Sequence, residues 1–466
     1  MKEIMKKINQ LEQHISMITF QDRLTKDDYD RLRDLNKQVK ELRKHSNADR
    51  LQVATFFGND TIVGLDVKVG DVGVYFPVDG QLGEEYATKN NLLRRKDENG
   101  NNVGGYLDPD KRNITALKLR GEKSDGLFMP LTSLEGFTDI SKLKIGDMIS
   151  VINGKVICQK YIPRTNRKPR VYTGGKKGKK KVVKETFPLF AEHADTEQLA
   201  YNLDAFKEGD ICYITLKMHG TSQRTAYTLK EKRKNLPYWL YKIAQFFKIK
   251  PKKTWEMVTG TRRVTLTNFN KEGGYYGSDA FRKPYHDFFT GKLHKGEEVF
   301  YEVLGYVNEN TLIMGEVSNK KTNDKEFIKQ YGETTKFTYG CKPNESIIRV
   351  YRMTMTNEDG YVVEYPTELV RRRCEEMGVE FVPVFEKFIF TTKEDLMERV
   401  EKYYDGPDPV GVVHIREGVV VRIDSSTKFR AYKHKNFNFK CIEGIAKNDA
   451  TAPDIEEAQE DLKTES

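Results

Sequence analysis

ICYITLKMHGTSQRTAY, residues 211–227, combines a strand pattern with a cluster of reactive side chains. Thr215 and Lys217 alternate with apolar residues, which predicts a β-strand with both side chains on one face. His219 continues this face, and Gly220 allows a ligand to approach the backbone closely because it has no side chain. A lysine at a strand end facing a cleft is a candidate nucleophile when neighbouring cations or burial lower the pKa of its amine. A Lys-x-His-Gly string alone is weak evidence, since three fixed positions recur by chance.

Two later segments place an acidic residue in a strand pattern. VFYEVLGY (299–306) has Glu302 as its only acid among apolar and aromatic residues, and REGVVVRID (416–424) puts Glu417 at the start of a run of valines. A charged group among apolar strand neighbours is costly to bury unless it is paired or binds a metal. Both residues are therefore candidates for a site, although Glu417 also fits an ordinary acid at a strand edge.

Two lysines follow in AYKHKNFNFK (431–440). Lys433 and Lys435 are two residues apart, so a strand projects both from one face. Together with Lys217 and the two acids, they predict a site that binds an anion and a metal ion.

The composition describes a foldable chain of two or three domains, with 466 residues, 38% hydrophobic and 32% charged. No stretch approaches the roughly 18 consecutive apolar residues of a membrane-spanning helix. The N-terminal residues show no secretory signal. The five cysteines lie far apart without a CxxC pair, which argues against disulfides and structural zinc and favours a cytoplasmic location.

The positive charge is concentrated in one segment. The chain has a net charge of +10, and residues 164–184 hold ten basic residues and no acidic one, so the remainder is formally balanced. A concentrated basic patch attracts a polyanion better than the same charge spread evenly. The alternative is a solvated, flexible linker.

The patterns along the chain predict five regions. Residues 1–44 read as two helices, and residues 45–161 contain five or six short strands separated by turns, which suggests a small barrel. A basic linker (162–185) leads to a mixed region (186–445) with all candidate site residues. The acidic, apolar-poor end (446–466) is predicted to be disordered.

In this order, the motifs resemble those of the covalent nucleotidyltransferase superfamily of ATP-dependent polynucleotide ligases and mRNA capping enzymes. The resemblance covers roughly residues 186–440. The matching residues are Lys217 to Gly220 for motif I, Glu302 for motif III, Glu417 for motif IV, and Lys433 with Lys435 for motif V.

Further residues follow from the same resemblance. IIRVYRMT (347–354) resembles the aromatic motif IIIa, which makes Tyr351 the candidate for stacking on the base. GTRRV resembles the early arginine-bearing segment, which implies that Arg262 or Arg263 lies near the phosphates or the ribose. Arg224, seven residues after the candidate nucleophile, is assigned to a polynucleotide 5′-phosphate.

The N-terminal part narrows the resemblance. HSNADRLQVATFFGNDTIVGLDVKVGDVGVYFPVDGQL resembles the OB-fold domain that precedes the ligase domain in the Deinococcus-type RNA ligase family, and LRGEKSDGL (119–127) and FPLFAEHADTEQLAYNL (187–203) fit the same family. DNA ligases and capping enzymes usually carry their OB domain after the catalytic domain. The expected fold class is therefore α+β: a helical hairpin, a small OB-fold barrel, and a nucleotidyltransferase domain of antiparallel sheets with flanking helices.

The resemblance implies an RNA ligase that uses ATP with Mg²⁺ or Mn²⁺. Lys217 would attack the α-phosphate to give a lysyl-adenylate, AMP would pass to a 5′-phosphate end, and a 3′-hydroxyl would then displace it. Lys433 and Lys435 are assigned to the α-phosphate, Glu417 to the metal and Glu302 to the ribose or an outer position. The implied partner is RNA, as a nicked or broken duplex or a tRNA-like molecule, and the implied role is RNA repair.

Several alternatives stay open at this point. His219 stands where motif I usually has an aspartate, so its role is undefined. Residues 1–44 are expected either to meet a protein or nucleic-acid partner or only to cover the barrel. We expect a monomer without a membrane contact. The competing functions are a nucleic-acid-binding OB protein with a degenerate ligase domain, a DNA ligase, and a capping-type guanylyltransferase.

Overall fold

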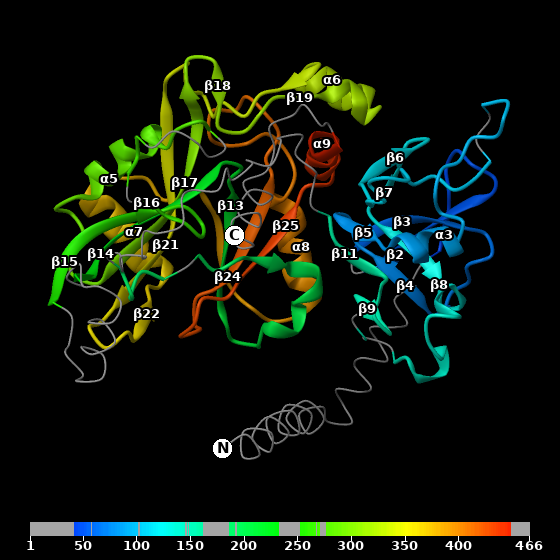
Figure 1. The fold of residues 1–466 in the computed structure, drawn as a ribbon, viewed down its shortest axis with the longest axis horizontal. Helices are drawn as coiled ribbons and strands as arrows, with labels where there is room; N and C mark the ends of the chain where they lie inside the picture. Colours follow the sequence, from blue (N-terminus) through cyan, green and yellow to red (C-terminus); the bar gives the residue numbers. More distant parts are fainter. Residues whose placement is uncertain are drawn as a thin grey trace, which may run out of the picture. The chain divides into compact units, whose positions relative to one another are not determined.

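The computed structural model describes residues 42–161 and 186–448, apart from 57, 101–102, 145–146, 148, 192, 233–251, 267 and 271–275. The chain divides into two compact units, one ending at Tyr161 and the other beginning at Ile162. Both combine mostly antiparallel sheets with few helices, which confirms the α+β class (Figure 1). No helix in these ranges is long and apolar enough to cross a membrane.

Three predicted regions lie largely outside the described residues. The helical hairpin (1–44) is one of them, and its last two residues, Arg43 and Lys44, form strand β1 instead of the end of a helix. The basic linker (162–185) is another. The acidic tail (446–466) was predicted to begin too early, because helix α9 extends to Asn448.

The described part of the first unit consists of short elements. They are β1 (Arg43–Lys44), β2 (Leu51–Phe56), β3 (Asn59–Gly64), β4 (Gly73–Phe76), β5 (Gly80–Leu82), α3 (Glu84–Lys89), β6 (Leu117–Leu119), β7 (Glu122–Ser124), β8 (Leu127–Pro130), η1 (Leu131–Leu134), η2 (Ile140–Lys142), β9 (Val151–Ile152), β10 (Lys155–Val156) and β11 (Cys158–Lys160). The sequence predicted five or six short strands in residues 45–161, and the described part of this range contains ten, β2 to β11. Strands β1, β2 and β3 form one antiparallel sheet, and the others pair in twos. The assignment of this unit to an OB-fold stays a prediction.

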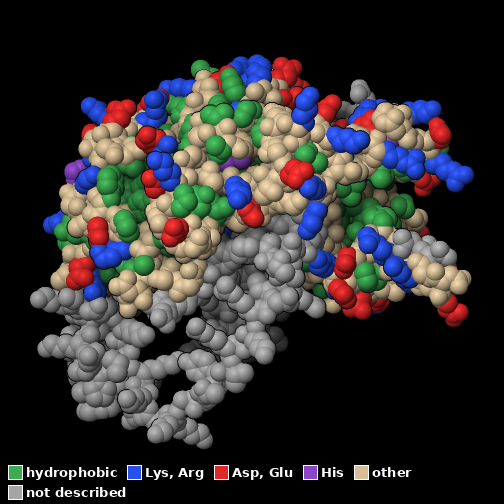
Figure 2. All heavy atoms as spheres, turned by 90° about the horizontal axis from the view of Figure 1, so that it is seen from above, with side chains coloured by type: hydrophobic (Ala, Val, Ile, Leu, Met, Phe, Trp, Pro, Cys, Tyr) green, Lys and Arg blue, Asp and Glu red, His purple; other side chains and the backbone are tan. Residues whose placement is uncertain are grey.

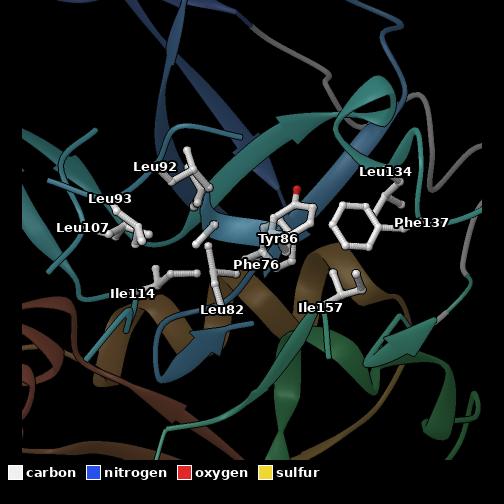
Figure 3. Close-up of a cluster of buried hydrophobic side chains, with 12 residues drawn as sticks. Phe76, Leu82, Tyr86, Leu92, Leu93, Leu107, Ile114, Leu134, Phe137 and Ile157 are labelled. Carbon is white, nitrogen blue, oxygen red and sulfur yellow. The ribbon is translucent and has the colours of Figure 1, made fainter. Parts of the chain in front are cut away.

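The core of the first unit surrounds helix α3, which the sequence did not predict. Figure 3 shows Tyr86 of this helix between Phe76 and Phe137, and the ring centroids lie 5.5 and 5.7 Å apart. The buried Tyr86 hydroxyl donates a hydrogen bond of 2.8 Å to the Ser133 hydroxyl, so burial leaves its polar atom satisfied.

The described part of the second unit contains two larger sheets and five α-helices. Its elements are β12 (Glu197–Gln198), η3 (Leu199–Tyr201), η4 (Leu203–Ala205), β13 (Ile211–Lys217), β14 (Thr221–Lys232), β15 (Lys252–Gly260), β16 (Thr265–Leu266), η5 (Ala280–Arg282), α5 (Lys283–Phe289), β17 (Glu297–Asn308), β18 (Thr311–Leu312), β19 (Val317–Ser318), η6 (Asn319–Thr322), α6 (Lys325–Tyr331), β20 (Thr334–Thr335), β21 (Ser346–Thr356), β22 (Val362–Glu364), α7 (Thr367–Met377), β23 (Val384–Ile389), α8 (Lys393–Tyr403), β24 (Gly418–Ile423), β25 (Ala431–Lys435) and α9 (Phe437–Asn448). The five-stranded sheet, here the first sheet, has the order β12-β25-β24-β13-β23, and only β12 runs parallel to its neighbour. The second sheet has the order β16-β15-β14-β17-β21-β22.

The register of the first sheet aligns the predicted motifs in rows. Lys217 of β13 lies opposite Gly418 of β24, which lies opposite Lys435 of β25. Two residues further along β24, Val420 lies opposite Thr215 of β13 and opposite Lys433 of β25. The alternate residues face away into a hydrophobic core that includes Ile214, Val419, Val421, Leu396 and Phe388. The period-2 alternation therefore places charged side chains on one face and apolar ones on the other.

The second sheet contains an irregularity at Tyr351. Phe300 of β17 pairs with Arg352 of β21, but the next residue, Tyr301, pairs with Val350, so Tyr351 is an extra residue. Such a bulge changes the direction of the extra side chain. It allows Tyr351 to share a cavity with Glu302, which stands on the face opposite the core residue Tyr301.

Charges of both signs are interspersed over the visible face of the described residues (Figure 2). This distribution agrees with a chain whose net excess equals the charge of residues 164–184.

Replacing Gly418 by alanine is expected to destabilise the protein by about 2–4 kcal/mol. Gly418 has a φ of +145°, and a Cβ there would lie 2.1 Å from the carbonyl oxygen of His434 on the neighbouring strand. The measurement is chemical denaturation of wild type and variant. The matched control is Gly209→Ala: its φ is +88°, but nothing lies within 4 Å of the added Cβ, so only backbone strain of about 1–2 kcal/mol is expected. Equal losses in the two variants would contradict the steric account.

Candidate active site

One cavity of about 230 Å³ gathers most of the predicted site residues. Its walls come from both sheets of the second unit and from residues 193–196. The predicted residues that line it are Lys217, His219, Gly220, Arg262, Glu302, Tyr351, Glu417, Lys433 and Lys435. Segments more than 200 residues apart in the sequence thus meet around one space.

Four charged groups form an alternating chain in this cavity. The Lys217 Nζ lies 2.7 Å from Glu417 Oε1, and the Lys435 Nζ lies 3.3 Å from the same oxygen. Lys435 also reaches Glu443 Oε2 of helix α9 at 2.7 Å. Two lysines and two carboxylates therefore balance, and the candidate nucleophile is held beside an acid.

Glu417 is charged although only 2% of its side chain is exposed. Burial by itself would raise the pKa of Glu417, but the charges of Lys217 and Lys435 outweigh it, so the pKa is lowered. Its second oxygen, Oε2, is buried and has no hydrogen-bond partner among the described residues. A buried carboxylate oxygen with spare capacity is a suitable ligand for Mg²⁺, which takes one or two protein carboxylates with phosphate and water oxygens. The described residues include no cluster of three or more His, Cys, Asp or Glu that could hold a metal without such help.

His219 is held by aromatic rings. It packs edge-on against Phe337 and Phe439, with ring centroids 4.6 and 4.8 Å apart, and its backbone N–H donates to the Tyr339 hydroxyl at 2.8 Å. Burial lowers the pKa of His219 to about 4, against the opposing effect of Glu417, so the ring is neutral at pH 7. The contact of 3.8 Å between its Nδ1 and Glu417 is therefore not an ion pair at that pH.

Lowering the pH is expected to destabilise the folded protein through His219. Its folded-state pKa of about 4 lies below the ordinary value of 6.5, so the unfolded chain binds the proton first. The contribution of the neutral ring is complete above about pH 6.5 and is lost as the pH falls toward 4. The stability difference between wild type and His219→Gln should shrink by about 1–2 kcal/mol from pH 7 to pH 5. Denaturation curves at both pH values provide the measurement, with the exposed His294→Gln as control; an unchanged difference for His219→Gln would refute the expectation.

Gly220 is constrained by packing as well as by the cavity. A Cβ at this position would lie 2.4 Å from the carbonyl oxygen of Val303 on β17. The turn after Lys217 therefore passes directly over the second sheet, and this contact brings β13 of the first sheet next to Glu302.

The second sheet supplies a polar and an aromatic side chain. The Ser222 hydroxyl donates to Glu302 Oε2 at 3.2 Å. The Tyr351 hydroxyl is 2.8 Å from His193 Nε2, and burial raises the pKa of Tyr351, so its phenol stays protonated. His193 belongs to the segment 187–203, and no pattern in the sequence marks it as a site residue.

Arg262 lines the cavity and forms an ion pair with Asp195. Asp195 also lies 3.7 Å from His193 Nδ1, and the His193 backbone N–H donates to the Arg262 carbonyl at 3.3 Å. Arg262 thus fastens residues 193–195 over the cavity. Arg263 is exposed and does not line it.

Arg224 does not line the cavity. It is 2% exposed, its guanidinium lies 3.9 Å from the centre of the Phe190 ring, and it donates to the carbonyl oxygens of Ala191 and Thr261. Its partner on β17 is Glu298, whose pKa burial raises to about 7. The assignment of Arg224 to a 5′-phosphate does not fit this position, because the guanidinium is buried and already contacts Phe190 and Ala191.

Comparisons with known proteins agree with this geometry at the level of the fold. No protein-family model matches the chain, and no curated protein does. Among solved structures, a lysine-to-methionine variant of Naegleria gruberi RNA ligase with AMP and Mn is similar over 86% of this chain and 95% of that one, with 15% identity and a TM-score of 0.52. A lysine-to-alanine variant of this ligase with ATP and Mn is similar over 86% of this chain and 96% of that one, with 14% identity and a TM-score of 0.51. The same ligase with PPi is similar over 85% of this chain and 94% of that one, with 15% identity and a TM-score of 0.50. The chain therefore shares its fold with an RNA ligase, while the Deinococcus-type assignment stays a prediction.

Proposed function

We propose that this protein is an ATP-dependent RNA ligase that joins 3′-hydroxyl and 5′-phosphate ends through a lysyl-adenylate. The observation that carries the proposal is the contact of 2.7 Å between Lys217 and the buried Glu417, with Lys435 beside them in one cavity. An amine at a strand end, a carboxylate with a spare oxygen and a second cation are what phosphoryl transfer to nitrogen requires. The shared fold with an RNA ligase solved with ATP, AMP and Mn supports the choice of reaction.

In the first step, uncharged Lys217 Nζ attacks the α-phosphorus of ATP. The new N–P bond forms as the bond from the α-phosphorus to the bridging oxygen breaks, and pyrophosphate leaves. Glu417 Oε1, at 2.7 Å, is placed to accept the proton that the amine must lose. The AMP then passes to a 5′-phosphate end, and attack by a 3′-hydroxyl releases AMP and makes the phosphodiester.

Glu417 is the residue we assign to Mg²⁺ or Mn²⁺, since its Oε2 is buried without a partner among the described residues. The bound ion would stabilise negative charge on the phosphate oxygens. Lys433 and Lys435 would contact the α-phosphate. To do so, Lys435 would give up its contacts with the carboxylates of Glu417 and Glu443. Glu302 would hold the ribose and Tyr351 would stack on the base.

The nucleic-acid partner we propose is RNA with a nick or break in a duplex, or a tRNA-like molecule, and the role we propose is repair. Residues 45–161 would serve as an OB-type binding unit. Residues 164–184, with ten basic side chains, would add phosphate contacts. We place the enzyme in the Deinococcus-type family, as a cytoplasmic monomer.

The test is incubation with α-labelled ATP or GTP and divalent metal, followed by denaturing electrophoresis. We expect label on the protein from ATP alone. Nicked duplexes with ribose or deoxyribose at the 3′-hydroxyl end then separate the two polymers, and we expect sealing only with ribose.

The other outcomes each select a competing function. Label from GTP would indicate a capping-type enzyme, and equal sealing of the deoxyribose end would indicate a DNA ligase. Absence of label with either nucleotide would leave only a binding protein with a degenerate ligase domain.

A further inference from the structure

The turn that follows the candidate nucleophile is held by a tyrosine from a distant loop. Strand β13 ends at Lys217 and β14 begins at Thr221, so residues 218–220 lie between the two strands. In this turn, the backbone N–H of His219 donates a hydrogen bond of 2.8 Å to the Tyr339 hydroxyl. Tyr339 is buried and does not line the cavity. An effect of Tyr339 on chemistry in the cavity must therefore pass through the turn.

The backbone of Tyr339 has a conformation that a bulky residue rarely adopts. Its φ is +53°, in the left-handed region, where the side chain crowds the backbone. Such a conformation persists only where the surroundings enforce it, and residues held in this way cluster at functional sites. Here the surroundings are a hydrophobic core that Tyr339 shares with Leu216 and Met218, the two neighbours of Lys217. The ring of Tyr339 therefore packs beside the same strand end that its hydroxyl holds.

A second loop contacts Tyr339 from another side. A Cβ at Gly411 would lie 2.5 Å from the Tyr339 carbonyl carbon, so the two backbones are in direct contact. The His414 ring packs edge-on against the Tyr339 ring, with centroids 4.5 Å apart. The loop is closed, because the Asp408 backbone N–H donates to the His414 carbonyl at 2.8 Å. Three residues after His414, the chain reaches Glu417.

We propose that Tyr339 is a positioning residue that sets the place of the Lys217 amine relative to Glu417. The inference rests on the proposed function, in which this amine attacks the α-phosphorus. The turn after Lys217 and the loop before Glu417 both contact Tyr339, so one side chain holds both partners of the 2.7 Å contact. A displacement of about 1 Å in the reacting geometry can slow a reaction about 100-fold. ATP binding does not depend on this alignment, so the rate of attack should respond alone.

The first experiment removes a single oxygen atom. Tyr339→Phe keeps the ring and loses the hydrogen bond to the turn. Single-turnover adenylation is measured against ATP concentration, and we expect the maximal rate to fall about 10- to 100-fold. The ATP concentration for half-maximal rate should stay that of wild type. Sealing of RNA that already carries a 5′-adenylate should also keep its wild-type rate, because that step uses no lysine nucleophile, whereas general damage to the fold would slow both reactions.

The matched control is Tyr285→Phe. It removes a tyrosine hydroxyl that lies 2.6 Å from the Ser346 hydroxyl, and Tyr285 does not line the cavity. This variant should adenylate like wild type. Three outcomes for Tyr339→Phe would each overturn the proposal: an unchanged maximal rate, a higher ATP concentration for half-maximal rate, or an equal loss of 5′-adenylate sealing.

The second experiment displaces Tyr339 from the side of the other loop. Gly411→Ala places a methyl group against the Tyr339 backbone, and we expect a lower maximal rate with the ATP dependence of wild type. The matched control is Gly332→Ala: Gly332 has a φ of +81°, close to the +80° of Gly411, but no described atom lies within 4 Å of the added Cβ. In the double variant of Tyr339→Phe and Gly411→Ala, the two losses should not multiply, because both act through one hydrogen bond. Losses that multiply would overturn the proposal.

These results are separable from the proposed function itself. Label from ATP on the wild-type protein tests the ligase, whatever the variants do. Label on the wild-type protein together with a wild-type rate in Tyr339→Phe would leave the ligase in place and remove only the role of Tyr339.

Discussion

Lys217→Arg is expected to lose all covalent label from α-labelled ATP. Arginine keeps the positive charge beside Glu417, but it stays protonated and offers no lone pair for attack on phosphorus. The contact of 2.7 Å shows that the wild-type amine is close enough to Glu417 to transfer a proton to it. The measurement is intact-protein mass spectrometry after incubation with ATP and Mg²⁺, which detects an added AMP directly.

A matched control separates this effect from a general loss of lysine. Lys230→Arg changes a partly buried lysine of β14 that does not line the cavity. The Lys230 Nζ lies 3.0 Å from Glu256 on the neighbouring strand β15. This control should label like wild type. Lys217→Arg should still seal RNA that already carries a 5′-adenylate, because that step needs no lysine nucleophile. An AMP adduct on Lys217→Arg would disprove the assignment of the nucleophile.

Glu417→Gln is expected to reduce the adenylation rate by at least about 100-fold, the scale on which lost electrostatic stabilisation acts. Three contributions disappear together: the proton acceptor for Lys217, the counter-charge for Lys435 and the carboxylate for the metal. The variant should also lose about 3–5 kcal/mol of stability, because two partly buried cations lose the buried carboxylate that they share. Single-turnover rates across a Mg²⁺ titration and denaturation curves measure the two effects.

Glu443→Gln is the control for this prediction. It removes a carboxylate that also pairs with Lys435, at 2.7 Å, but it leaves the contact between Lys217 and Glu417 intact. Its rate should fall less and its Mg²⁺ dependence should stay that of wild type. Equal losses and equal Mg²⁺ dependence in both variants would mean that Glu417 acts only as a counter-charge.

The strands of the site could be predicted because their alternation is strict. The strand before His219 is β13, the run with Glu302 is β17, and the valines after Glu417 are β24. Each has apolar residues on the core face, so period 2 is readable from the sequence. That these strands would surround one cavity came from the resemblance, since local patterns do not determine which distant strands pair.

The assignment of Arg224 went wrong for a physical reason. Arg224 was assigned to a 5′-phosphate, yet its guanidinium packs on Phe190 and donates to the carbonyl oxygen of Ala191. A long cationic side chain serves equally well as a ligand or as a brace, and only the tertiary contacts decide between these roles. The same segment supplies His193, for which no periodic pattern gave a signal.

Glu443 was missed for a related reason. It lies eight residues after Lys435 in helix α9, where the sequence pattern changes from strand to helix. Helix α9 brings Glu443 back to the end of strand β25, next to Lys435. Neither the strand nor the helix pattern shows this by itself.

The bulge at Tyr351 has a consequence for how sequences of this kind can diverge. Deleting one residue from β21 before the bulge would shift the pairing of that part of the strand by one residue. Its inward-facing and outward-facing side chains would then change places. Length changes should therefore be rare in 346–351, while the turn at 357–360 can absorb them. Alignments of related chains should place their gaps accordingly.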